Sequence, residues 1–136
     1  MNLAQIWRYP IKSHGSENLN SIDIHSGKTL PLDRTWAVVH DQSDADGSSW
    51  VPCRNFSRVA KAPQLAAISA TWTSDKKLEL SHPSIGKICI DPDFDSSKFI
   101  NWVSLLMPKG RAASIKLVRS VQTGMTDTDF PSISIG

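Results

Sequence analysis

The order of hydrophobic and polar positions along the chain predicts a mainly β protein made of short strands. Apolar runs of strand length alternate with turn residues such as Pro, Gly, Asp and Ser. A sheet of short strands leaves no unpaired edge strand when it closes on itself. The regular spacing of the strands therefore predicts a β-barrel or a rolled antiparallel sheet. The segments expected to be strands are residues 3–9, 19–24, 36–40, 65–73, 78–80, 88–90 and 115–118.

Two of these segments carry further information. Along residues 65–73 the side chains of Ala66, Ile68, Ala70 and Trp72 form a consistently apolar face, so the opposite face is expected to contact water. The run at 36–40 is followed by an Asp/Ser/Gly-rich stretch at 41–49 and by Trp50-Val51, which predicts a long hairpin.

One amphipathic helix is expected at about residues 96–107. Phe99, Trp102, Val103 and Leu106 recur at helical spacing, and Pro108 stops the pattern. The division that follows is one domain over residues 1–119 and a polar connection with a strand stub over residues 120–136.

Composition is that of a soluble globular domain. The chain has 136 residues, 40% of them hydrophobic, and a formal net charge of +2, which gives no overall field that would favour nucleic acid or a membrane surface. Cys53 and Cys89 form no CxxC pair, so a cytoplasmic location is expected. Cys89, between two isoleucines, is predicted to be a buried thiol. The role of Cys53 beside Arg54 stays open, since no adjacent histidine could act as its base.

Basic residues near the predicted strand ends are the main candidates for chemistry. Arginine offers a planar fork of donors, lysine a point charge and serine a hydroxyl, so together they could hold a phosphate group. The alternative interpretation is that they are solvated surface or edge protection. The residues concerned are Arg8, Lys12, Ser13, His14, Arg34, Arg54, Arg58 and Lys61.

Particular residues connect this cluster to a known family. The run Tyr9-Pro10-Ile11-Lys12-Ser13, then Gly15, then Leu32-Asp33-Arg34 with Trp36 beyond it, resembles the N-terminal β-barrel domain that precedes MOSC domains. That family includes the C-terminal regions of molybdenum cofactor sulfurases and mitochondrial amidoxime-reducing components. The resemblance covers nearly the whole chain, and residues 120–136 resemble the connection to, and first strand of, a truncated MOSC domain.

The resemblance implies a role in binding the molybdenum cofactor. Lys12, Ser13 and Arg34 match the positions that hold the phosphate of molybdopterin, and Arg54 is assigned to the same cofactor-binding set. Asp33 is interpreted as structural. Residues 55–61 add length before Pro63, which leaves the register of the arginine loop open, and Thr29 stands where the family commonly has glycine.

The family's metal-binding cysteine comes late in the MOSC domain, and no residue of this chain matches it. No catalytic residue and no metal ligand are therefore predicted, and the cofactor is expected in the full-length protein, without tight binding to this fragment. The fragment would belong to a molybdenum-cofactor oxidoreductase or a sulfur-carrier protein. The expected partners are the C-terminal MOSC domain and, for an oxidoreductase, a redox partner.

A free-standing β-barrel interaction scaffold without a cofactor is the alternative. A calcium loop at 42–53 is excluded because Gln42 and Cys53 would occupy its first and last ligand positions, where carboxylates are required. Of the five tryptophans, four are predicted to be buried and only Trp50 is a plausible ligand contact. The four are Trp7, Trp36, Trp72 and Trp102.

Overall fold

The computed structural model describes residues 6–23, 30–58, 62–110, 113–120 and 125. Within these residues the strands form three antiparallel sheets that do not close into a barrel, with one α-helix in the C-terminal part, which confirms the expected mainly β class. The strands are β1 (Ile6–Arg8), β2 (Glu17–Leu19), β3 (Trp36–His40), β4 (Ser69–Trp72), β5 (Leu78–His82), β6 (Gly86–Ile90) and β7 (Ser114–Arg119). Three 3-10 turns, η1 (Cys53–Asn55), η2 (Pro63–Ala67) and η3 (Ser104–Leu106), accompany the helix α1 (Ser96–Val103).

β4, β5 and β6 form a three-stranded meander. Its buried face carries Ala70, Leu78, Leu80 and Ile90, whereas neighbouring positions of β4 point to water, as the alternation predicts. The strand expected at 65–73 is shorter than predicted, because Pro63 fixes its φ angle and opens the turn η2 over the first half of the segment.

β3 is an inner strand with a partner from the far end of the chain. Its predicted hairpin with Trp50-Val51 is wrong, since β3 pairs antiparallel with β7, and Val39 on its other edge forms an isolated bridge with Phe56. Four of its five residues are buried, so hydrogen bonds are needed on both edges, which one hairpin cannot supply.

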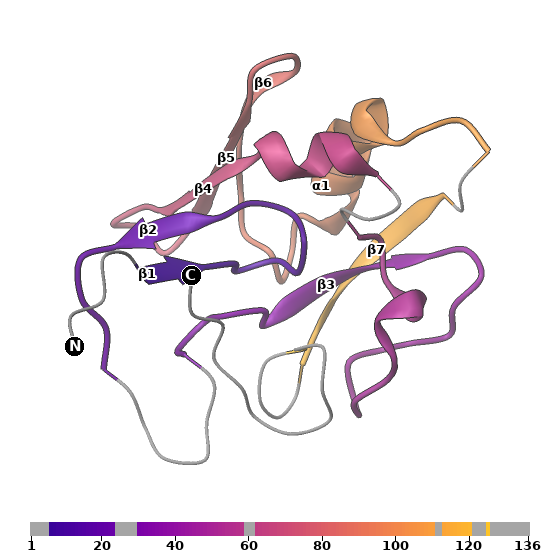
Figure 1. Ribbon diagram of the computed structural model, residues 1–136, viewed down its shortest axis with the longest axis horizontal. Coiled ribbons are helices and arrows are strands. Elements are labelled where there is room, and N and C mark those ends of the chain that lie inside the picture. The colour runs from indigo at the N-terminus through magenta and orange to yellow at the C-terminus, as the bar shows by residue number, and fades with distance from the viewer. Residues whose placement is uncertain (1–5, 24–29, 59–61, 111–112, 121–124, 126–136) are drawn as a thin grey trace.

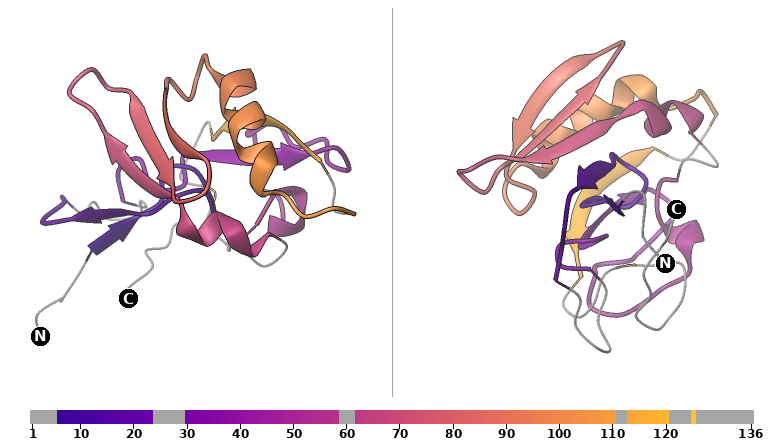
Figure 2. Two further views of the ribbon diagram at one scale, coloured as in Figure 1. Left: turned by 90° about the horizontal axis from the view of Figure 1, so that it is seen from above. Right: turned by 60° about the vertical axis from the view of Figure 1, so that its left-hand side comes forward.

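The amphipathic stripe of α1 and η3 faces the interior as predicted. Phe99, Val103 and Leu106 are buried, and the helix contacts β6 and β7. Figure 1 and the right view of Figure 2 show the meander and α1 together above the smaller β1–β2 and β3–β7 sheets. The helix therefore contacts both the meander and the β3–β7 sheet, and its buried residues belong to the same hydrophobic cluster as those of the meander.

Two sequence-based burial predictions are wrong. Trp7 is 37% exposed, because Ile6 and Arg8 on either side of it take the inward positions of β1. Cys89 is exposed, because strand alternation turns it outward next to the buried Ile90. The side chain of Cys53 and the predicted strand stub at 133–136 lie outside the described residues.

None of the helices in the described ranges has the length and hydropathy that a membrane crossing requires.

Candidate functional site

Two turns that are distant in the sequence are joined by main-chain hydrogen bonds. Residues 9–12 lie parallel to residues 34–36, with an isolated bridge between Ile11 and Trp36. The N–H of Arg34 donates to the carbonyl of Tyr9 at 2.6 Å, and the N–H of Lys12 donates to the carbonyl of Trp36 at 2.8 Å. The main chains carrying Lys12 and Arg34 are therefore side by side.

Both turns contain residues in the left-handed region of backbone space. Ser13 has φ 63°, Leu32 has φ 61° and Arg34 has φ 49°, and among the described non-glycine residues only Lys76 shares this feature. Such conformations cost of order 1–3 kcal/mol each and gather at ligand-binding sites. Three of the four such positions among the described non-glycine residues lie in these two turns, and two of them, Ser13 and Arg34, are candidate phosphate-binding residues from the sequence.

Asp33 ties the two turns together through its side chain. One carboxylate oxygen accepts the N–H of Tyr9 at 2.9 Å, and the other accepts Nε and Nη2 of Arg34 at 2.9 and 2.8 Å. Both side chains are buried, so the carboxylate compensates the guanidinium charge and fixes its orientation. This geometry agrees with a structural role for Asp33.

His14 supports the same turn without adding positive charge. Its ring is fully buried, and Nδ1 lies 2.7 Å from the carbonyl of Lys12. Burial lowers the pKa of His14 from 6.5 to about 4, although the hydrogen bond to Lys12 acts in the opposite direction. The imidazole is therefore neutral near pH 7, and Lys12, only 4% exposed, is the cation of this turn.

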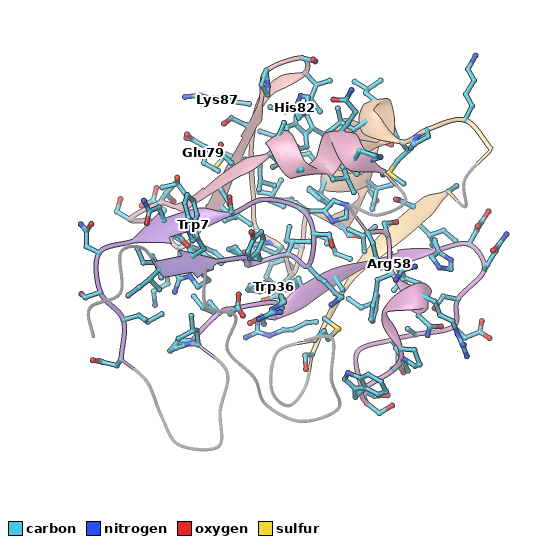
Figure 3. The ribbon with its side chains drawn as sticks, in the orientation of Figure 1. Trp7, Trp36, Arg58, Glu79, His82 and Lys87 are labelled. Carbon is cyan, nitrogen blue, oxygen red and sulfur yellow. The ribbon has the colours of Figure 1, made fainter. Side chains whose placement is uncertain are left out.

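The structure does not bring Arg54 to this place. Its main-chain carbonyl lies 2.6 Å from Nε2 of His40, at the end of β3 opposite Trp36, and its side chain is exposed. Trp36 and His40 are about 13 Å apart along a strand of this length. Figure 3 labels Arg58, a residue of the same basic group, alongside β3. Sequence reasoning grouped Arg58 with the other basic residues but gave it no role.

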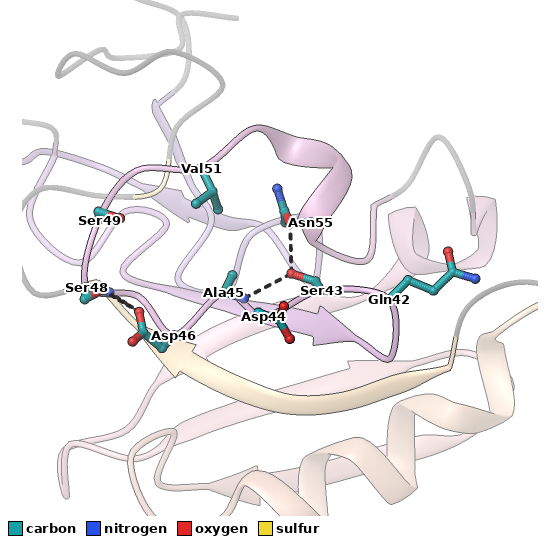
Figure 4. Close-up of a pocket in the computed structure, with 9 residues that line it drawn as sticks. All are labelled: Gln42, Ser43, Asp44, Ala45, Asp46, Ser48, Ser49, Val51 and Asn55. Atoms are coloured by element: carbon teal, nitrogen blue, oxygen red, sulfur yellow. Dashed lines mark hydrogen bonds between the residues drawn. The ribbon is translucent and has the colours of Figure 1, made fainter.

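Two surface hollows are lined by described residues, one distant from these turns and one adjoining them at Leu32 and Trp36. The first, of about 450 Å³, is formed by the loop between β3 and η1. Figure 4 shows two hydrogen bonds among its lining residues, one from the Ser43 hydroxyl to the Asn55 side-chain carbonyl and one from the Ser48 N–H to the Asp46 carboxylate. Within the described residues no three His, Cys, Asp or Glu side chains gather in a metal-binding group.

The second hollow, of about 460 Å³, lies between Trp36 and Trp72. Asp93 accepts the indole N–H of Trp36 at 2.9 Å and pairs with Arg119 at 2.7 Å. The Arg119 guanidinium in turn lies 5.2 Å from the centre of the Trp36 ring. Asp93 and Arg119, which both line this hollow, thus pair with each other.

The fold and the site define a small mainly β domain with a buried, basic junction between two turns. A comparison with known families agrees, because the profile described as the MOSC N-terminal beta barrel domain matches residues 1–114. The chain therefore belongs to the MOSC N-terminal domain family. No curated protein and no solved structure matches the chain.

Proposed function

We propose that this domain holds the phosphate group of molybdopterin, using Lys12, Ser13 and Arg34. The observation that carries the proposal is the hydrogen-bonded pairing of residues 9–12 with residues 34–36. It places an ammonium-bearing, a hydroxyl-bearing and a guanidinium-bearing residue on adjacent main-chain segments. Charge-assisted hydrogen bonds from such groups are the usual means of binding phosphate.

The residues present suit a phosphate ester. The main chain is strained at Ser13 and Arg34, and the two cationic residues are buried, as expected for groups prepared to meet an anion. Asp33 orients Arg34 before any ligand arrives, so little side-chain entropy would be lost on binding.

The chemistry of the cofactor would come from its molybdenum. The residues of this chain would bind and orient the anionic end only, and on the family resemblance the metal ligand belongs to the MOSC domain. That domain is accordingly the proposed partner of this one.

The experiment is an anaerobic calorimetric titration of the chain with molybdopterin and with the same ligand after phosphatase treatment. Lys12→Ala and Arg34→Ala should each weaken binding about 10- to 100-fold, the effect of losing a charged hydrogen-bond donor. Lys87→Ala is the matched control, because it removes an exposed lysine whose Nζ lies 3.7 Å from Oε1 of Glu79. Circular dichroism checks the fold of every variant.

The two ligands separate the proposal from its alternative. The proposal requires that removing the phosphate reduces affinity for the wild-type chain by a similar factor. Equal affinity for both ligands, or Lys12→Ala and Arg34→Ala variants that bind like Lys87→Ala, would favour an interaction scaffold with a merely basic surface.

A further inference from the structure

Two chain segments share the edge of β3 that does not face β7. The N–H of Lys12 donates to the carbonyl of Trp36, and the N–H of Ser57 donates to the carbonyl of Val38 at 2.9 Å. Carbonyls two residues apart point to the same edge of a strand and lie about 7 Å from each other. Lys12 and Ser57 are therefore successive neighbours along one edge.

The directions of the two segments make them meet end to end. Residues 10–12 run parallel to β3 and so advance toward Val38, whereas residues 56–57 run antiparallel to it, as the bridge between Val39 and Phe56 shows. The chain must leave the edge after Lys12, which it does through the left-handed turn at Ser13. Arg58 continues the opposing segment and thus arrives beside Lys12 and Ser13.

Arg58 is distinguished by the absence of a partner. Its Nε atom is buried and makes no hydrogen bond, and within the described ranges no carboxylate lies within ion-pair distance of its guanidinium. Arg8, Arg34 and Arg119 pair with Glu17, Asp33 and Asp93, respectively. A buried donor left unpaired costs about 1–3 kcal/mol and calls for an explanation, of which an absent anion is one.

We infer that Arg58 is a further anion-binding residue of this domain and donates to the phosphate beside Lys12 and Ser13. The inference rests on the proposed function and assigns to Arg58 the part that the sequence gave to Arg54. A phosphate monoester carries about one and a half to two negative charges near pH 7, so it suits the Arg58 guanidinium, which has no carboxylate partner among the described residues.

The test compares Arg58→Met, Arg58→Lys and Arg54→Met in the full chain. Each variant is titrated with molybdopterin under anaerobic conditions, and its melting temperature is measured without ligand and with inorganic phosphate. Lys87→Met controls for the loss of a surface charge. Lys12→Met reports on the proposed function itself.

Arg58→Met should bind molybdopterin at least 10-fold more weakly than wild type, with a melting temperature without ligand equal to or above that of wild type. Arg54→Met and Lys87→Met should bind like wild type. Arg58→Lys keeps the charge but loses the planar fork, so an intermediate affinity is expected. A purely structural arginine would give the opposite result, namely a lower melting temperature and unchanged affinity.

The outcomes distinguish a wrong assignment of Arg58 from a wrong proposed function. Wild-type affinity in Arg58→Met together with weak binding in Lys12→Met overturns the assignment of Arg58 and leaves the proposed function standing. A wild-type chain that does not bind molybdopterin overturns both. Should Arg58→Met fail to fold, Arg58→Lys decides, since a loss of threefold or more supports the assignment and an unchanged affinity refutes it.

Discussion

Acidification should destabilise this domain through His14. The ring is fully buried and lies edge-on to Phe99, with ring centres 5.7 Å apart. A carbonyl can only accept, so the nitrogen facing the Lys12 carbonyl carries the proton, and Nε2 is left as a buried acceptor without a partner. Protonation of Nε2 would place a charge in an apolar core.

The magnitude follows from the pKa of His14, which is about 4 in the folded protein and 6.5 in the reference state. Between these values the unfolded chain binds a proton that the folded chain does not, so stability falls as the pH falls. The slope approaches 1.4 kcal/mol per pH unit, which gives a loss of about 2 kcal/mol between pH 7 and pH 5. The loss levels off below pH 4, where both states are protonated.

The assay is urea unfolding at pH 7, 6 and 5, followed by tryptophan fluorescence, for wild type and His14→Asn. Asparagine can still donate to the Lys12 carbonyl but does not titrate in this range. The variant is less stable at pH 7 because it leaves a cavity, and its stability should fall about 2 kcal/mol less than that of wild type on acidification. Parallel decreases for the two proteins would refute the reasoning.

Three further substitutions test individual features. Ser13→Gly should raise the free energy of unfolding by about 1 kcal/mol, because glycine tolerates φ 63°, yet weaken molybdopterin binding in calorimetry. Asp33→Ala should lower the free energy of unfolding in urea by about 3 kcal/mol, since Arg34 would keep a buried charge without this carboxylate. Gly47→Ala should lower the melting temperature markedly, because its Cβ would overlap the carbonyl group of Arg119 at a φ of 88°. Unchanged stability in any of the three would contradict the corresponding contact.

Elements fixed by local patterns could be predicted from the sequence. The meander and the helix depend on periodicity and on nearby turn residues, and both lie close to where the sequence placed them. The partner of β3 could not be predicted, because its pairing with β7 spans most of the chain and leaves no local mark. The turn η2 was missed since Ala66 and Ile68 fit a strand as well as a tight turn.

For the proposed site, the family resemblance pointed to Lys12, Ser13 and Arg34, and it added Arg54 with the register of the arginine loop left open. The proposed assignment of Arg58 depends on which residues occupy the edge of β3, and the bridge between Val39 and Phe56, on which it is argued, leaves no mark in the sequence. The sequence held a partial signal for Arg58. Residues 55–61 add length before Pro63, which leaves open whether Arg54 or Arg58 stands at the family's arginine position.

The turn at residues 13–16 also joins two sheets, which has a consequence for binding. On one side Lys12 bonds to Trp36 of β3, and on the other the N–H of Ala70 in β4 donates to the carbonyl of Ser16 at 3.0 Å. A Cβ on Gly15 would lie 3.0 Å from Ile68, so the turn rests directly on the core of the meander. A phosphate held by this turn would stabilise both attachments, since a ligand that binds only the folded state raises the free energy of unfolding by RT ln(1 + L/Kd), where L is the free ligand concentration.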